Sequence, residues 1–580
     1  MNSNLSKCIA PEAQEEELQR FGREIAALER GELDVEDFRK FRLENGVYGI
    51  RGTMDKHMIR IKIRFGALTP EQLECIADVA EQFTPLQLSH VTTRQAIQLH
   101  NIDRKDVPAA LRMMAESGLT TREACGNTVR NVSACPFAGV AADEAFDVTP
   151  YADAVSKFFL RNAVCQNLPR KFKIAFEGCP TDHARVPIHD FGAVAKIRDG
   201  KRGFQCYVGG GLGPTPMSAQ LLEEWTPEHL LIPSIEAAIR IHDRHGNRKD
   251  RARARIKFVL KEWGIEEFRK TWLAERTLAI MTRSGAADWS MPITEETAPP
   301  PPTVKAIAPS NSTEYARWRE TNVFAQKQKG YTSVHVRCPL GDVTPKQMRG
   351  VAAIARSYCG GRIRTAITQN LVLRWVPETH VANVYAELGA IGLAHREAQH
   401  ITDITRCPGA DTCQIAVTHS RGLAGALGEI FNNGLSKDPV LQDLTIKISG
   451  CPNSCGQHHI ADIGFFGTAK VIDKHQVAHY RMLLGGGTRE GQAYFGAQVI
   501  VLPAKRVPEA VKKLLILYRD TRGADEGFRD FVQRIGLPHI KKHLDEFTTL
   551  PPYSERPDLY GDLGHEGEFK VEIGKGECAA

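Results

Sequence analysis

The chain has 580 residues, of which 42% are hydrophobic and 25% are charged, close to the usage of an average globular protein. Lys and Arg number 75 and Asp and Glu number 69, and a formal net charge of +6 is too small for this length to indicate a nucleic-acid-binding protein. No run of about 18 apolar residues is present, and the N-terminal residues are acidic and polar where a secretion signal would be apolar. We therefore expect a cytoplasmic protein of roughly three to four domains, with no membrane or nucleic-acid partner.

Taken in order, the chain reads as an arm, two similar halves joined by a linker, and a tail. The arm is charged and is predicted to be helical rather than part of a core. Four consecutive prolines and a Ser/Thr-rich flank predict an extended linker between the halves. The tail is polar and rich in Gly and Pro, and we expect it to be loosely held. The predicted boundaries are 1–45 for the arm, 46–118 and 119–293 for the first half, 294–325 for the linker, 326–396 and 397–550 for the second half, and 551–580 for the tail.

Sequence motifs that recur at a constant offset show that the two halves are repeats of one another. Both contain a strand-like run, a Gly-Cys-Pro motif, an Asp-hydrophobic-Gly motif and another strand-like run. Cys179 matches Cys451 at an offset of 272 residues (451 − 179). The same offset relates Cys135 to Cys407, Asp190 to Asp462 and Gly192 to Gly464.

In each half, a smaller repeated unit precedes these motifs. Thr-Pro opens a helical pattern at Thr69 and again at Thr344, an offset of 275, and we match Thr93 with Thr368 at the same offset. Each unit alternates a strand, the Thr-Pro helix and a second strand. Chance similarity does not explain several matches at nearly one offset, so we predict an internally duplicated α+β fold.

Four cysteines in the second half form the strongest candidate metal site. They are spaced C-x5-C and then C-x3-C, at Cys407, Cys413, Cys451 and Cys455. Structural zinc sites commonly use tighter pairs, whereas four thiolates, two of them followed by Pro, suit an iron–sulfur cluster. The interpretation as an iron–sulfur site is favoured, with zinc and unrelated thiols as alternatives.

The first half retains only part of this cysteine set. Cys135 and Cys179 remain, but Ala141 and His183 occupy the positions of the other two cysteines. A cluster in the first half would therefore lack ligands. Retained buried thiols are the favoured interpretation, and a different metal site that uses His183 is the alternative.

Cations gather in the first half, where the cysteine set is incomplete. Arg94, Arg130, Lys171 and Lys173 lie in short motifs between apolar runs. Lys171 and Lys173 alternate on a strand pattern and therefore project to the same face. Such a face is costly unless it meets solvent or an anion, and Arg forks suit bidentate contacts with oxyanions. An anion site is favoured over separately solvated charges.

Two further segments carry weaker signals. Gly209, Gly210 and Gly211 lack the third glycine of a dinucleotide-binding loop, which leaves a plain turn or a loop that approaches an anionic cofactor. Their counterparts, 485–487, are shifted by four residues from the 272 offset. A basic run from 246 to 257 reads as a solvated helix face or as a docking surface for an acidic partner.

Taken together, these residues resemble a known family. The motifs TTRQAIQLH, CGNTVRNVSACP, NLPRKFK, QKQKGYTSVHV, CPGADTC and GCPNSC resemble those of siroheme-containing nitrite and sulfite reductases of the monomeric, ferredoxin-dependent type, over roughly residues 40–540. The resemblance implies two ferredoxin-like half-domains (46–118 and 326–396) that pair across the halves. It also implies two larger lobes (119–293 and 397–550) around siroheme.

The resemblance also implies the cofactors and their ligands. It implies a [4Fe-4S] cluster on Cys407, Cys413, Cys451 and Cys455, with the Cys455 thiolate bridging to the siroheme iron. The anion would be held by Arg94, Arg130, Lys171 and Lys173. The other cofactor-binding residues would be Gly209, Gly210, Gly211 and Asn453, besides Cys455, Arg94 and Arg130.

The expected reaction is the six-electron reduction of an oxyanion, with electrons from a ferredoxin or a similar acidic donor. Sulfite is favoured over nitrite, because nitrite enzymes of the family tend to have Asn where Lys173 stands. Nitrite reduction to ammonia by the same site is the alternative. A metal-stabilised binding module without enzymatic activity is a further alternative.

Overall fold

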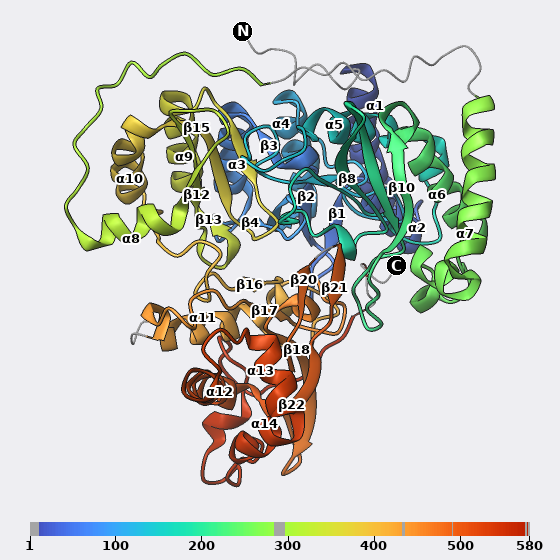
Figure 1. Cartoon of the computed structure of the whole chain (residues 1–580). Helices are drawn as coiled ribbons and strands as arrows, with labels where there is room; N and C mark the ends of the chain where they lie inside the picture. Colours follow the sequence, from blue (N-terminus) through green and yellow to red (C-terminus); the bar gives the residue numbers. More distant parts are fainter. Residues whose placement is uncertain (1–10, 283–295, 432–434, 490, 575–576, 578–580) are drawn as a thin grey trace.

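The computed structural model describes residues 11–282, 296–431, 435–489, 491–574 and 577. Figure 1 shows the two half-domains side by side, with the first lobe in green beside them and the second lobe in orange and red below. One hydrophobic core runs through the N-terminal helices, both half-domains and the first lobe, and a second core fills the second lobe. Within the described residues, no helix is both long and apolar enough to cross a membrane.

Each half-domain contains a five-stranded sheet whose last strand comes from the other half. The sheet orders are β1-β2-β5-β4-β13 and β11-β12-β15-β14-β3. Because each half completes the other's sheet, the two half-domains pair as predicted. The strands are β1 Val47–Gly49, β2 Lys56–Ile61, β3 Ala67–Leu68, β4 Ser89–Val91 and β5 Ile97–Asp103 in half-domain 1, and β11 Val323–Ala325, β12 Tyr331–Val336, β13 Asp342–Val343, β14 Ile363–Thr365 and β15 Leu371–Pro377 in half-domain 2.

The Thr-Pro motifs begin the main helix of each half-domain, as predicted. These helices are α3 (Pro70–Phe83) and α9 (Pro345–Tyr358). The hydroxyl of Thr69 accepts a hydrogen bond from the N–H of Gln72, and the Gln72 side chain accepts one from the N–H of Thr69. Such a capping box satisfies two amide groups that the helix itself leaves unpaired, and α9 has the same arrangement.

The offset between the two half-domains changes by one residue after this helix, from the predicted 275 to 274. β4 and β14 lie at an offset of 274, because the connection after α9 is one residue shorter than the connection after α3. Thr93 therefore corresponds to Ile367, and the match of Thr93 with Thr368 is wrong. Arg94 corresponds to Thr368, so only the first copy of this loop carries a cation.

The two lobes share one sheet plan. The orders are β10-β9-β8-β7-β6 and β16-β17-β18-β19-β22. Ile174 pairs with Phe191 in the first lobe and Ile446 pairs with Ile463 in the second, so the 272 offset holds. The strands are β6 Ser133–Ala134, β7 Ile174–Glu177, β8 Phe191–Arg198, β9 Lys201–Val208 and β10 Gln220–Pro227, and β16 Thr405–Arg406, β17 Ile446–Ser449, β18 Ile463–Ile472, β19 His475–Leu484 and β22 Ala497–Pro503.

The shift of four residues at the glycine runs has a simple cause. The hairpin strands β18 and β19 are each two residues longer than β8 and β9. The segments after the hairpins are therefore related by 276 rather than 272 residues. The remaining elements are α4 Val107–Glu116, α5 Thr149–Phe159, α6 Leu231–His245, α7 Ile256–Met281, α10 Val381–Ala390, α11 Ser420–Phe431, α12 Val507–Thr521, α13 Phe528–Ile535 and α14 Leu537–His543, with the small hairpin β20 Gly487–Arg489 and β21 Gln492–Tyr494.

The N-terminal segment is helical, as predicted, but it belongs to the core. It forms α1 (Pro11–Glu29) and α2 (Val35–Glu44). The Phe21 and Phe38 side chains are buried and pack edge to face. The expectation of an arm outside the core is therefore wrong, because these aromatic side chains are covered by residues distant in sequence.

The predicted linker and tail also contain ordered contacts. Helix α8 (Thr313–Asn322) lies in the predicted linker and buries Trp318 completely. In the tail, Glu577 forms a buried ion pair with Arg42 of α2. Residues 1–10 of the predicted arm and 283–295, where the first half meets the linker, lie outside the described residues.

Candidate active site

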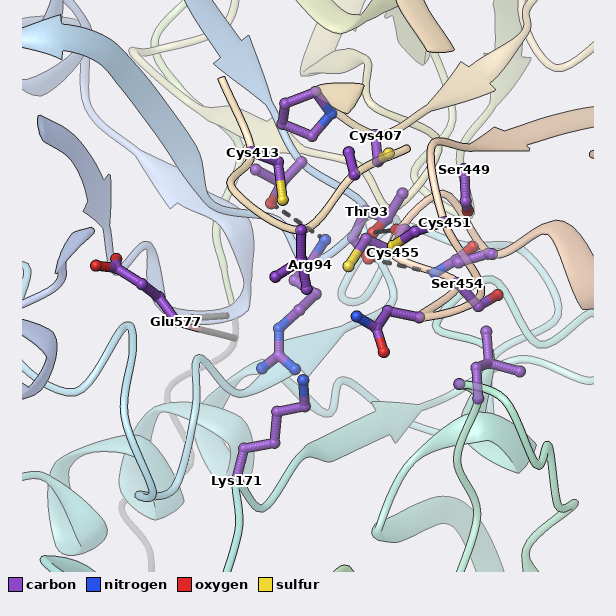
Figure 2. Close-up of a pocket in the computed structure, with 18 of the residues that line it drawn as sticks. Thr93, Arg94, Lys171, Cys407, Cys413, Ser449, Cys451, Ser454, Cys455 and Glu577 are labelled. Carbon is purple, nitrogen blue, oxygen red and sulfur yellow. Dashed lines mark hydrogen bonds between the residues drawn. The ribbon is translucent and has the colours of Figure 1, made fainter. Parts of the chain in front are cut away.

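A cavity of about 430 Å³ lies where half-domain 1 meets both lobes. Loops at strand ends form most of its walls, together with strands β2 and β5, so residues far apart in sequence face a common space (Figure 2). The principal segments are 92–94 between β4 and β5, 170–173 before β7, 212–215 after β9, 251–258 around the start of α7, 406–416 after β16 and 449–457 after β17.

The described lining residues are strongly cationic. Glu577 is the one carboxylate among them. The Lys and Arg residues of the lining are Arg60, Arg94, Arg130, Arg170, Lys171, Lys173, Arg251, Arg255, Lys257 and Arg406. All four cations predicted from the sequence are included. Arg255 and Arg406 form ion pairs with Asp190 and Asp342. The other like charges repel one another in a poorly solvated space, so the cavity is suited to a ligand with several negative charges.

Arg94 has an unsatisfied donor in the cavity wall. Its Nη2 donates to the carbonyl oxygen of Asn131 at 3.0 Å. Its Nη1 is buried and has no hydrogen-bond partner within the described part of the chain. Burial, with the nearby charge of Arg130, lowers the pKa of Arg94 to about 9. An anion placed at Nη1 would satisfy this donor and relieve the repulsion.

Lys171 and Lys173 both face the cavity because Phe172 between them is buried in the core. Figure 2 shows the Lys171 side chain extending towards the Arg94 guanidinium group. Burial lowers the pKa of Lys173 well below its ordinary value, and the charges of Arg94, Arg255 and Lys171 lower it further. A neighbouring anion would have the opposite effect on this pKa.

Arg130 is held mainly by backbone oxygens. Its Nε and Nη2 donate to the carbonyl of Gly126 at 3.0 and 2.6 Å, and its Nη1 donates to the carbonyl of Ala124 at 3.1 Å. These contacts fix the guanidinium group in the wall without neutralising it. Arg130 therefore contributes mainly a fixed positive charge to the cavity.

Asp190 of the repeated Asp-hydrophobic-Gly motif anchors this wall. Its carboxylate accepts from the N–H of Lys173 at 2.9 Å and from Arg255 Nη2 at 2.6 Å. Burial disfavours the charged form, but Arg255 outweighs burial and lowers the pKa of the Asp190 carboxyl. In the second half, Asp462 accepts from the N–H of Thr445 in the equivalent place. The motif thus fixes the residue immediately before strand β7 in the first lobe and before strand β17 in the second.

Replacing Asp190 with alanine is expected to lower the free energy of unfolding by about 3–5 kcal/mol, because Arg255 would remain buried without its counter-ion. Denaturant unfolding measures the change. The matched control is Lys40→Ala, which breaks the fully exposed pair with Asp37 and should change stability little. Equal effects of the two substitutions would contradict the anchoring role.

The four cysteines predicted as ligands also meet at this cavity. Cys407 follows β16, and Cys451 and Cys455 follow β17. The N–H of Gly450 donates to the Cys407 sulfur at 3.2 Å. The hydroxyl of Thr93 donates to the carbonyl of Cys455 at 2.9 Å, which joins the loop before Arg94 to the cysteine loop (Figure 2). The predicted cation and cysteine sites are therefore adjacent.

The spacing of these cysteines does not suit one small ion. Among the described side chains, no three of the four sulfurs come within 4.8 Å of one another. A tetrahedral zinc ion would hold thiolate sulfurs about 3.8 Å apart. Their spacing therefore favours a multinuclear cluster over zinc, which the sequence had left as an alternative.

The predicted cofactor-binding glycines lie behind the lining, whereas Asn453 lies in it. The three glycines are packed against protein groups. A Cβ on Gly209 would lie 2.3 Å from the Leu260 side chain, and one on Gly210 would lie 2.4 Å from the carbonyl oxygen of Pro187. A Cβ on Gly211 would meet the guanidinium group of Arg255. The structure therefore explains this run by close packing, and the next residues, Leu212 and Gly213, line the cavity instead.

Comparison with protein-family models matches four segments of the chain. The model for the nitrite and sulphite reductase 4Fe-4S domain matches residues 125–278 and 397–549. The model for the nitrite/sulfite reductase ferredoxin-like half domain matches 51–117 and 324–391. The chain belongs to the nitrite and sulphite reductase family. The predicted resemblance, the duplicated α+β fold and the assignment as an oxidoreductase are confirmed.

Some relatives of this chain are named nitrite reductases and others are named sulfite reductases. A ferredoxin–nitrite reductase of Synechococcus elongatus is 27% identical over 481 residues, covering 81% of this chain and 88% of the relative. Sulfite reductase (ferredoxin) 1 of Mycolicibacterium paratuberculosis is 28% identical over 483 residues, covering 82% of each. The solved structure of the Mycobacterium tuberculosis NirA protein has a TM-score of 0.76 and 25% identity, covering 93% of this chain and 97% of that one.

The structure adds cations that the sequence had not assigned to the site of this reductase. Arg255 and Lys257 come from the run interpreted as a solvated face or docking surface, but both are buried and line the cavity. Burial, with the charge of Arg255, lowers the pKa of Lys257 to about 7. Its ammonium group donates to the carbonyls of Leu212 and Thr215. The buried Asp190 could have indicated the need for a cationic partner, but not which residue supplies it.

Proposed function

We propose that this protein reduces sulfite to sulfide with six electrons, using siroheme and a [4Fe-4S] cluster in the cavity. The observation that carries the proposal is the meeting of a cationic wall with the four-cysteine site in one cavity. The matching family model describes a 4Fe-4S domain, which supports the cluster. Reduction of nitrite to ammonia is the second candidate, because relatives with both names match at similar identity.

The residues present fit siroheme, a tetrapyrrole with several carboxylates. The fixed charge of Arg130 and other cations of the lining would attract these carboxylates, and the unsatisfied Nη1 of Arg94 is one available donor. Asn453 and Cys455 would contact it from the second lobe. When bound, siroheme and the cluster supply the electrons and the iron site at which the anion is reduced.

The cysteine ligands of the cluster would be Cys407, Cys413, Cys451 and Cys455. Cys455 would also provide the thiolate shared with siroheme. Its backbone carbonyl is bonded to Thr93, so half-domain 1 holds this loop against the wall that carries Arg94. This contact between the halves would hold a proposed cluster ligand beside the cationic wall.

The cations of the first half would bind and protonate the substrate. Arg94, Lys171 and Lys173 would attract the oxyanion and stabilise negative charge on its oxygen atoms as bonds to oxygen break. The lowered pKa of Lys173 makes its ammonium group a stronger acid, so it is suited to donate a proton to a departing oxygen. Arg94 retains its proton much more strongly and would serve mainly in binding.

The electron donor would be a ferredoxin or a similar small acidic protein. The names of relatives include ferredoxin. Arg248, Lys249 and Arg253 are exposed beside the buried cations at the start of α7. These exposed charges are suited to a transient encounter with an acidic surface.

The test is turnover with sulfite and with nitrite side by side, using reduced viologen or reduced ferredoxin and following sulfide and ammonia. We expect the higher kcat/KM with sulfite. A higher kcat/KM with nitrite would support the second candidate instead. Turnover of neither anion by protein containing both cofactors would overturn the proposed function.

A further inference from the structure

A second group of potential metal ligands lies in the first lobe, outside the active-site cavity. Cys135 follows β6 and Cys179 follows β7, at the positions that correspond to Cys407 and Cys451 in the second lobe. The two sulfurs are 3.9 Å apart, and the Cys135 sulfur is 3.5 Å from His183 Nδ1. A carboxylate oxygen of Glu177 completes a set of four atoms that all lie within 4.8 Å of one another.

The distances match those around a single tetrahedral ion. Zinc–sulfur bonds of about 2.3 Å and zinc–nitrogen bonds of about 2.0–2.1 Å place two sulfurs about 3.8 Å apart and a sulfur and a nitrogen about 3.6 Å apart. The cysteines of the second lobe are more widely spaced. Equivalent positions in the two lobes thus hold potential metal ligands that are spaced differently.

The surroundings of this group favour a cation. The Glu177 carboxylate is fully buried and accepts from the backbone N–H groups of Gly178, Cys179 and Ala184. No ion pair joins it to a Lys or Arg residue in the described part of the chain. Asp182 adds a second carboxylate nearby, and its Oδ2 is buried with no hydrogen-bond partner among the described residues.

We propose that Cys135, Cys179 and His183 bind one Zn²⁺ ion, with the Glu177 carboxylate as the fourth ligand. Binding forms two zinc–thiolate bonds and releases the two thiol protons to solvent, with no change in oxidation state. His183 would coordinate through Nδ1 and keep its proton on Nε2. His183 is half-buried and Pro180 and Thr181 are exposed, so the ion has a short route from solvent.

The ion would stiffen one wall of the active site. The segment from Cys179 to His183 continues into Ile188 and His189, which line the cavity. Tying its start to the end of β6 would hold this wall in place independently of siroheme and the cluster. The proposed role is therefore structural, and zinc has no part in electron transfer.

The test is the zinc content and the zinc-edge X-ray absorption of the purified holoenzyme. We expect about one zinc per chain, with two sulfur neighbours at about 2.3 Å and two nitrogen or oxygen neighbours at about 2.0 Å. A chain without zinc after growth in zinc-sufficient medium, or zinc with only nitrogen and oxygen neighbours, would overturn the proposal. So would a disulfide between Cys135 and Cys179.

Variants separate this site from the proposed cluster. In the double substitution Cys135→Ser and Cys179→Ser, zinc should be lost while the iron content stays unchanged. The matched control is Cys165→Ser with Cys206→Ser, two buried cysteines elsewhere in the first half, and it should keep its zinc. Zinc retained in the first variant would contradict the assignment. Because the absorption measurement uses the unaltered protein, poor folding of a variant does not remove the test.

Discussion

Replacing Cys455 with alanine is expected to abolish reduction of both anions, with a loss of about 10³-fold or more in viologen-driven turnover. The substitution removes a proposed cluster ligand and the thiolate proposed to join the cluster to siroheme. Bound anion would then receive electrons poorly even if the cationic wall were intact. Turnover, iron content and the visible spectrum measure the loss together.

The control for this substitution is Cys165→Ser. Cys165 is fully buried in the first lobe and does not line the cavity. Its replacement should leave turnover and iron content close to those of the unaltered protein. Full turnover in the Cys455→Ala variant would contradict the proposed arrangement of the cofactors.

Replacing Lys173 with asparagine is expected to lower kcat/KM for sulfite by about 10²–10³-fold, the usual effect of removing one group that stabilises an oxyanion. The loss for nitrite should be smaller, about tenfold, because nitrite carries less negative charge than the sulfite dianion and gains less from each cation. The substitution also removes a proposed proton donor, which affects both anions. Parallel assays with the two substrates separate the effects.

Lys201→Asn provides the matched control, because Lys201 is exposed on β9 and does not line the cavity. It should alter neither reaction. Equal losses for sulfite and nitrite in the Lys173→Asn variant would mean that this lysine contributes to turnover without setting the substrate preference.

The duplicated fold was predictable because its repeated motifs hold the same structural positions. Asp190 and Asp462 are far apart in sequence, yet each accepts a hydrogen bond from the backbone N–H of the residue immediately before the adjacent strand. The one-residue shift near Thr93 was not visible, because weak similarity in a short loop does not determine the length of the connection. The burial of Phe21 likewise depends on residues distant in sequence.

The sequence predicted the chemistry of the active site but not the full set of residues that line it. Arg94, Lys173 and the cysteines stood out as unusual polar groups among apolar runs, and they face the same cavity. Arg255 and Lys257 belong to a run in which Arg248 and Arg253 are exposed. Only the tertiary contacts with Asp190 and with backbone carbonyls distinguish the buried cations from the exposed ones.

The measurement that tests the central claim most directly is the cofactor content of the purified protein. Acid extraction should yield about one carboxylate-bearing tetrapyrrole per chain, and metal analysis should find about five irons, four in the cluster and one in the tetrapyrrole. A protein produced alongside siroheme synthesis that binds the cluster but no tetrapyrrole would contradict the assignment of the cationic cavity.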